Sequence, residues 1–235
     1  MAPATLADGT PAMLKIGKPH MEADHEAAGM LFWNGDPTVR VLNTDDEFNA
    51  LLLERCIPGT SLREQPEEEQ DEVIARLLRR LWRLPASLHP FRPLSKMLEF
   101  WSQETLAHSK HWPDQVLVRE GLDLFHELAL TAPNQVLLAT DLHAGNVLRA
   151  QREPWLVIDP KPFIGDPAYD ATQHLLNCRA RLRSAPLDTI RRFADLLAVD
   201  PERVRLWLFA RVAAEPRSRW DDMEAIALSK AISKS

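Results

Sequence analysis

Long apolar runs are missing from this sequence, and cysteine is rare. In its 235 residues, no stretch reaches the roughly 18 consecutive apolar residues that a membrane-spanning helix needs. The first residues do not join a basic start to an apolar run, so no secretory signal is predicted. The two cysteines, Cys56 and Cys178, lie far apart in the sequence, which predicts neither a disulfide nor a metal site. We therefore expect a protein of the reducing cytoplasm.

Glycine and net positive charge are scarce as well. Eight glycines stand against 18 prolines, which favours rigid turns over flexible linkers. A formal net charge of −6 argues against nucleic acid as the main partner and suits a cationic small molecule. With 45% hydrophobic residues and no internal repeat, the chain can bury one large core or two lobes around a cleft. We expect it to act as a monomer.

The most informative segments are residues 140–146 (TDLHAGN) and 158–161 (IDPK). Each adjoins a short apolar run, at residues 137–139, 147–148 and 155–158, and such runs are typical of short buried strands. An Asp, an Asn five residues later and a second Asp thirteen residues after that therefore lie at strand ends. A scaffold can direct their side chains toward one point.

Phosphoryl transfer is the chemistry that needs this set. Asp141 can orient a hydroxyl and accept its proton, while Asn146 and Asp159 offer the oxygen ligands that Mg²⁺ prefers. His143 lies between the first two and can brace the loop by hydrogen bonds. The alternative is an ordinary pair of turns, because Asp and Asn are common turn residues. The second Asp, after its own apolar strand, favours the kinase interpretation.

The same residues carry a resemblance to a known family. Residues 140–148 (TDLHAGNVL) and 157–170 (VIDPKPFIGDPAYD) resemble the aminoglycoside/hydroxyurea antibiotic resistance kinases, whose best-known members are streptomycin 6-phosphotransferases. Ala139 and Thr140 replace the His-Gly that usually opens the loop. Upstream, the resemblance extends through residues 8–15, 25–28 and 51–59, so it covers most of residues 8–180.

The resemblance implies a role for each matched residue. Asp141 would be the catalytic base with His143 in the catalytic loop, and Asn146 and Asp159 would bind Mg²⁺. Lys15 would contact the α- and β-phosphates of ATP, with Glu26 as its ion-pair partner. Residues 54–56, including Glu54 and Cys56, would form the hinge whose backbone meets the adenine.

Two of these roles have plain alternatives in the sequence. Lys15 could be a solvated lysine at a strand end, which is the common fate of a lone lysine. Glu26 could be an exposed helix charge, and Glu22 is a rival partner for Lys15.

The resemblance implies an α+β, two-lobed protein-kinase-like fold. Residues 1–58 would form a small β-rich lobe that binds nucleotide, and residues 59–235 a larger helical lobe for catalysis and substrate. In the small lobe we expect strands at residues 2–6, 13–16, 39–42 and 51–53, and a helix at 20–32. In the large lobe we expect a helix with an acidic first turn at residues 67–69 and an apolar stripe from residue 73 to 82, opposite a row of arginines. Further helices are expected from residue 94 to 107, from 114 to 130, and after residue 170.

Only fourteen residues precede Lys15, whereas the family places two strands and a phosphate-covering turn there. Residues 2–6 can form one strand, and Asp8-Gly9 is a good hairpin turn into the next. The expected N-terminal lobe is thus incomplete, which would lower affinity for ATP. An inactive nucleotide-binding remnant is therefore one alternative to a kinase.

The substrate is less determined by the sequence than the reaction. Streptomycin, or another cationic aminoglycoside, is the first expectation by resemblance, and hydroxyurea or another small hydroxyl compound is the alternative. Lys161 could contact a phosphate or lie on the surface, and Asp166 could cap the next helix or brace the catalytic loop. Candidate acidic residues for a cationic substrate lie near the C-terminus: Glu215, Asp221, Asp222 and Glu224.

Overall fold

The computed structural model describes residues 1–17, 21, 24–216 and 223–233. The chain folds into two compact units. The first unit combines Met1–Phe91 with Leu137–Phe163, and the second combines Arg92–Val136 with Ile164–Ser235. Both units join segments that are distant in the sequence, and the lobe boundary between residues 58 and 59 stays a prediction.

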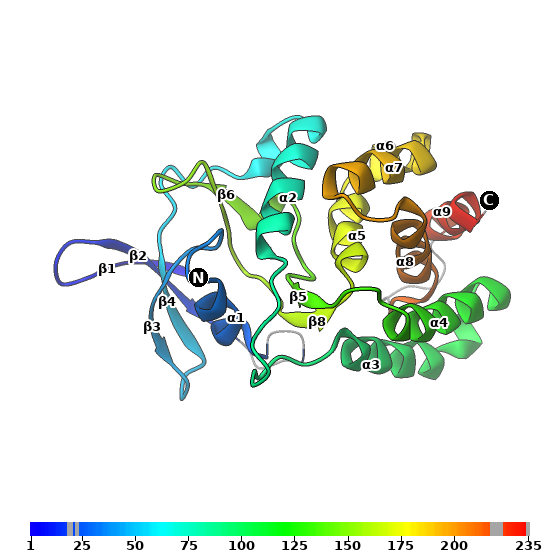
Figure 1. Cartoon of the computed structure of the whole chain (residues 1–235), viewed down its shortest axis with the longest axis horizontal. Coiled ribbons are helices and arrows are strands. Elements are labelled where there is room, and N and C mark those ends of the chain that lie inside the picture. The colour runs from blue at the N-terminus through cyan, green and yellow to red at the C-terminus, as the bar shows by residue number, and fades with distance from the viewer. Residues whose placement is uncertain (18–20, 22–23, 217–222, 234–235) are drawn as a thin grey trace. The chain divides into compact units, whose positions relative to one another are not determined.

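The first unit contains an antiparallel sheet of four strands, in the order β1-β2-β4-β3 (Figure 1). Their bounds are Ala2–Thr5 for β1, Pro11–Ile16 for β2, Val41–Asp45 for β3 and Ala50–Glu54 for β4. The turn between β1 and β2 lies at Asp8-Gly9, as predicted: the Asp8 carboxylate accepts from the backbone N–H of Thr10 at 2.9 Å. Gly9 has φ +86°, a conformation that side chains disfavour.

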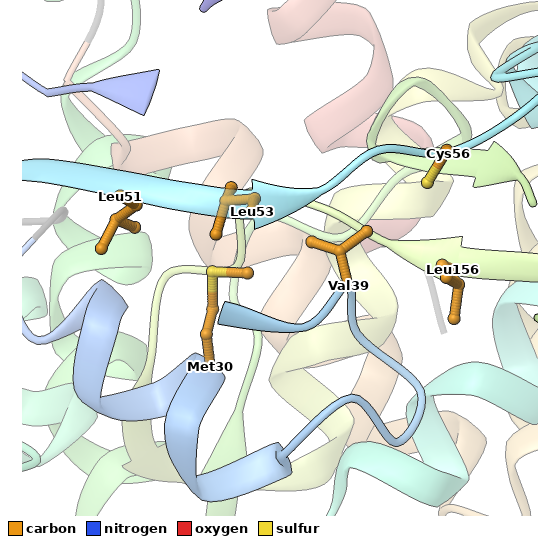
Figure 2. Packing of buried hydrophobic residues seen from close by; sticks show 6 residues of the cluster. All are labelled: Met30, Val39, Leu51, Leu53, Cys56 and Leu156. Atoms are coloured by element: carbon orange, nitrogen blue, oxygen red, sulfur yellow. The ribbon is translucent and has the colours of Figure 1, made fainter. Parts of the chain in front are cut away.

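Helix α1 (Glu26–Trp33) packs beside this sheet, and the small core between them is apolar. Figure 2 shows Met30 of α1 pointing at Leu51 and Leu53 of β4, with Val39, Cys56 and Leu156 completing the cluster. The predicted helix at residues 20–32 starts too early. His25 has φ 67°, a left-handed conformation that α-helix cannot continue, so α1 begins at Glu26. Residues 18–20 and 22–23, Glu22 included, lie outside the described residues.

Strand β3 begins two residues later than predicted. The backbone N–H of Val39 donates to the carbonyl oxygen of Val157 at 3.0 Å, so this stretch pairs first with a remote strand and only then with β4. That remote strand is β7 (Trp155–Val157), which forms an antiparallel hairpin with β6 (Val147–Arg149). Sequence periodicity cannot show a pairing over such a separation.

Helix α2 (Glu67–Leu81) completes the first unit, together with a short 3₁₀ turn at Leu62–Glu64. Its apolar stripe is buried as predicted, and its first turn is acidic, which the helix dipole favours. Arg80, one of the arginines on the other side, pairs with Asp36 and with Glu153 at 2.7 Å. This arginine therefore serves the fold.

The second unit is mainly helical, and α8 (Pro201–Ala214) is buried along most of its length. Around it lie α3 (Leu94–Ala107), α4 (Gln115–Leu130), α5 (Pro167–Asn177), α6 (Arg179–Ser184), α7 (Pro186–Leu197) and α9 (Met223–Ser233). The bounds of α3 match the prediction, and Asp114 caps α4. At Gly121, an added Cβ would lie 2.9 Å from Ala213, so α4 and α8 approach closely because that side chain is missing. None of the helices in the described ranges is long and apolar enough to cross a membrane.

Two short strands lie where the chain passes between the units, β5 (Val136–Leu138) and β8 (Phe163–Gly165). Immediately after β8, Asp166 caps α5 by accepting from the backbone N–H of Ala168 at 3.0 Å. The same carboxylate accepts from the indole N–H of Trp207 at 2.7 Å and pairs with Arg203. Of the two roles that the sequence left open for Asp166, the structure shows the helix cap.

Candidate active site

The loop after β5 turns sharply and exposes one carboxylate. Thr140 has φ 46°, and the backbone N–H of Asp141 donates back to the carbonyl oxygen of Ala139 at 2.7 Å. The amide nitrogen of Asn146 donates to the carbonyl oxygen of Asp141 at 3.0 Å and lies 3.5 Å from its carboxylate. These bonds hold the loop closed, while the Asp141 side chain keeps 35% of its surface exposed.

His143 braces the middle of this loop. Its Nδ1 accepts from the backbone N–H of Gly145 at 3.0 Å, and its Nε2 lies 4.0 Å from the Asp141 carboxylate. Gly145 is needed for this contact, because an added Cβ would lie 2.7 Å from the His143 ring and 2.9 Å from Arg63. The bracing that the sequence suggested for His143 is present, and its assignment to catalysis stays a prediction.

The turn that carries Asp159 is tied to the same loop by backbone bonds. The N–H of Ile158 donates to the carbonyl oxygen of Asn146 at 2.9 Å, and the N–H of Lys161 donates to that of Ala139 at 2.8 Å. Asp159 itself has φ 55°. The two turns around Asp141 and Asp159 therefore hold each other in place.

Lys15 and Glu26 join Asp159 in a half-buried charge cluster. The Lys15 ammonium donates to the Glu26 carboxylate and, at 2.5 Å, to Asp159. Burial alone would raise the pKa of Asp159, but hydrogen bonds from Lys15 and Lys161 outweigh it and hold that pKa below its usual value. The structure thus brings Lys15 and Glu26 to Asp159, although both are far from it in the sequence.

Lys161, left open by the sequence, lies inside this cluster. Its ammonium also donates to Asp159 and lies 3.6 Å from the second oxygen of Glu26. Burial works to lower the pKa of Lys161, but the negative charges of Glu26, Asp159 and Asp141 raise it overall. Lys161 is therefore a largely buried cation beside the loop that carries Asp141, with 11% of its side chain exposed.

A nucleotide and its Mg²⁺ fit the donor set of this site. Asn146 binds the loop through its amide nitrogen, which turns its amide oxygen away from that carbonyl. That oxygen and the Asp159 carboxylate are hard ligands of the kind that Mg²⁺ takes beside phosphate oxygens. The Lys15 and Lys161 ammoniums add two positive charges beside the Asp159 carboxylate.

A sequence model of the aminoglycoside/hydroxyurea antibiotic resistance kinase family matches residues 1–223. This chain belongs to that family. Among its curated relatives, hydroxyurea phosphotransferase of Kitasatospora aureofaciens is 35% identical over 216 residues, which are 89% of this chain and 62% of that protein. Streptomycin 6-kinase of Streptomyces griseus is 33% identical over 234 residues, which are 94% of this chain and 74% of that protein. The chain therefore spans 62% and 74% of the lengths of these two relatives.

Solved structures place this family member in a protein-kinase-like fold. Choline kinase LicA from Streptococcus pneumoniae superposes with a TM-score of 0.70 at 12% identity, covering 99% of this chain and 89% of that chain. A structure of LicA in complex with AMP gives 0.62 at 12% identity, covering 95% of this chain and 83% of that chain. At such identity the likeness shows the fold alone, and it confirms the predicted fold class.

At the predicted hinge of this resistance-kinase chain, the side chains serve the fold. The Glu54 carboxylate accepts from Arg152 at 2.9 Å and from the backbone N–H of Arg40 at 3.0 Å. Cys56 is buried in the core of Figure 2, and burial, then the charge of Glu54, raises the pKa of its thiol to about 11. Adenine binding by this backbone stays a prediction.

Arg152 is a structural residue that the sequence did not reveal. It also donates to the carbonyl oxygens of Gly35 at 2.8 Å and Thr38 at 2.9 Å. It thereby fastens the end of β4, through Glu54, to the loop before β3. No motif marks such an arginine, because its partners are a hundred residues away.

The acidic candidates for substrate binding lie in the second unit, where arginines accompany them. Glu215 pairs with Arg211 at 2.9 Å, and Glu224 pairs with Arg183 at 2.9 Å. Both glutamates line a pocket of about 270 Å³ on this unit, together with these arginines. Asp221 and Asp222 lie outside the described residues. The charge of this pocket is therefore mixed rather than acidic.

Proposed function

We propose that this chain is an ATP- and Mg²⁺-dependent kinase that phosphorylates a hydroxyl of an aminoglycoside, with streptomycin as the first substrate to test. The observation that carries the proposal is the clustering within one unit: the Asp141 loop, Asn146, Asp159 and the Lys15–Glu26 pair are linked by the bonds described above. This is the division of labour that phosphoryl transfer requires.

In this proposal, each side chain acts through position and charge. Asp141, the most exposed of the carboxylates, orients the substrate hydroxyl and takes its proton. Lys15, held by Glu26, steadies the α- and β-phosphates. Bound at Asn146 and Asp159, Mg²⁺ would neutralise charge on the phosphate oxygens. His143 keeps the Asp141 loop in one conformation.

The names of the relatives do not separate two substrates, since identity is 33% to a streptomycin 6-kinase and 35% to a hydroxyurea phosphotransferase. The net charge of −6 favours a cationic substrate, because an acidic protein attracts a cation by long-range forces. Hydroxyurea is the second candidate. We further propose that the protein is a cytoplasmic monomer without a nucleic-acid or membrane partner. Phosphorylation of the aminoglycoside by this protein would inactivate the drug.

The test is Mg²⁺-dependent release of ADP with streptomycin and, separately, with hydroxyurea. We compare the parent chain with Asp141→Asn and with Asp188→Asn as the matched control, since Asp188 is 83% exposed in the second unit. We expect Asp141→Asn to lower kcat by roughly 100-fold or more, because it removes the proton acceptor. The control should match the parent.

Either substrate result is informative. ADP release with only one of the two compounds identifies the acceptor. ATP binding by folded parent protein, without ADP release with either compound or with other aminoglycosides, contradicts the proposal and supports a nucleotide-binding remnant.

A further inference from the structure

The backbone around Lys161 is held more rigidly than a surface lysine requires. Pro160 precedes it and Pro162 follows it, and proline fixes φ at both positions. Its N–H donates to Ala139 at 2.8 Å, and its carbonyl oxygen accepts from the Thr140 hydroxyl at 2.7 Å. Lys161 therefore extends from a fixed point beside the catalytic loop.

The Lys161 ammonium shares its anionic partners with Lys15. Both ammoniums donate to the same oxygen, Oδ1 of Asp159. Glu26 lies between them, with Oε1 bonded to Lys15 and Oε2 at 3.6 Å from Lys161. Two like charges that converge on one carboxylate oxygen repel each other. A phosphate oxygen placed at this point would be attracted by both ammoniums.

The chemistry of the ammonium group points the same way. An ammonium has three N–H donors, and among the described residues the structure gives Lys161 one hydrogen-bonded partner for its side chain, Asp159. Donors thus remain for a ligand. The ammonium also lies within electrostatic reach of Asp141, whose charge acts on it. A phosphate oxygen is an acceptor that suits both the charge and the remaining donors.

We propose that Lys161 is a second phosphate-binding cation of this site, and that it contacts the terminal phosphates of ATP alongside Lys15. The proposal rests on the kinase function above and deepens it. Under it, Lys161 acts on the nucleotide and on the transferred phosphoryl group, and Glu26 positions both ammoniums. Because the contact lies at the terminal phosphates, it should matter for ATP and not for AMP.

The first test is binding and needs no turnover. We measure Kd for MgATP and for AMP by calorimetry with the parent chain, Lys161→Met, Lys161→Arg and the control Lys96→Met. Lys96 is a surface lysine whose side chain is 59% exposed. We expect Lys161→Met to weaken ATP by roughly tenfold or more, as loss of one charged hydrogen bond would, and to leave AMP unchanged. Lys161→Arg should recover part of the ATP affinity.

The second test is kinetic. With the substrate found for the parent, Lys161→Met should lower kcat/KM for ATP by roughly 100-fold, since a charge that stabilises the transferred group is lost. Lys96→Met should not change it. Equal weakening of ATP and AMP, or ATP affinity and kcat/KM within threefold of the parent, would overturn the assignment of Lys161.

The kinase function and the role of Lys161 can be contradicted independently of each other. A parent chain without turnover contradicts the kinase function, whereas the ATP-against-AMP comparison still decides whether Lys161 binds phosphate. Should Lys161→Met not fold, Lys161→Gln replaces it, with circular dichroism to verify the fold before binding is measured.

Discussion

Both units of this chain bury charged side chains, but they use them differently. In the second unit, Asp166 is 2% exposed and its oxygens accept from a backbone N–H, an indole N–H and an arginine. In the first unit, the Asp159 side chain is 29% exposed, and two ammoniums meet on one of its oxygens. A buried charge with distinct partners belongs to the fold. A half-exposed carboxylate shared by two cations indicates a site that is arranged for a ligand.

Removing the buried carboxylate of Asp166 should have the largest effect on stability. Asp166→Ala takes away the cap of α5 and leaves Arg203 and the Trp207 indole without their acceptor. We expect a loss of about 3–5 kcal/mol in the free energy of unfolding, as for other broken buried pairs. Urea denaturation monitored by circular dichroism measures it, with Asp188→Ala as the exposed control. A loss below about 1 kcal/mol would fall in the range of ordinary surface changes and contradict this interpretation.

Removing the charge of Asp159, which both lysines contact, should lower activity more than stability. Asp159→Asn removes the charge that both lysines contact, and we expect kcat to fall by roughly 100-fold or more. The free energy of unfolding should fall by less than in Asp166→Ala, because the Asn side chain keeps an acceptor oxygen and Glu26 remains as a partner of both ammoniums. ADP release and urea denaturation on the same preparation give both numbers. If Asp159→Asn loses more stability than Asp166→Ala, the contrast between the units is wrong.

The pair of Glu54 and Arg152 should give the smallest effect, and one that depends on pH. Burial acts to raise the pKa of Glu54, but the hydrogen bond from Arg152 and others lower it below the usual 4.5. A lowered pKa adds stability above pH 4.5, which is lost as pH falls through the folded-state value. Glu54→Gln should therefore destabilise the chain, by less than about 1 kcal/mol, at neutral pH. In acid, below the folded-state pKa, parent and variant should unfold alike, and thermal denaturation at both pH values measures the difference.

Local signals were enough to predict much of this structure. The helix α3 has the predicted bounds, and the Asp8-Gly9 turn and the acidic start of α2 follow from residue chemistry. The residues now gathered around Asp159 were also identified, through the strand-end motifs and the family resemblance. The helix, the turn and the strand-end motifs each depend on a signal within a few residues, whereas Lys15 and Glu26 were identified through the family resemblance.

The features that could not be predicted depend on distant partners. Helix α1 begins later than predicted because His25 is left-handed, and nothing in the residue type requires that conformation. Val39 pairs with Val157, and Arg152 binds Glu54, across about a hundred residues. For Lys161, spacing could not distinguish a surface lysine from a cation held between carboxylates. Only the folded chain shows that Lys161 contacts Asp159 and lies close to Glu26.

The helix that carries Glu26 has a further property that bears on the charge cluster around Asp159. An added Cβ on Gly29 would lie 2.9 Å from the ring of Pro162 and 3.1 Å from Trp33, so α1 meets the segment after Lys161 with no space to spare. Glycine at position 29 therefore sets how closely the helix that carries Glu26 approaches the segment that carries Lys161, and a larger residue there would move Glu26 away from both ammoniums.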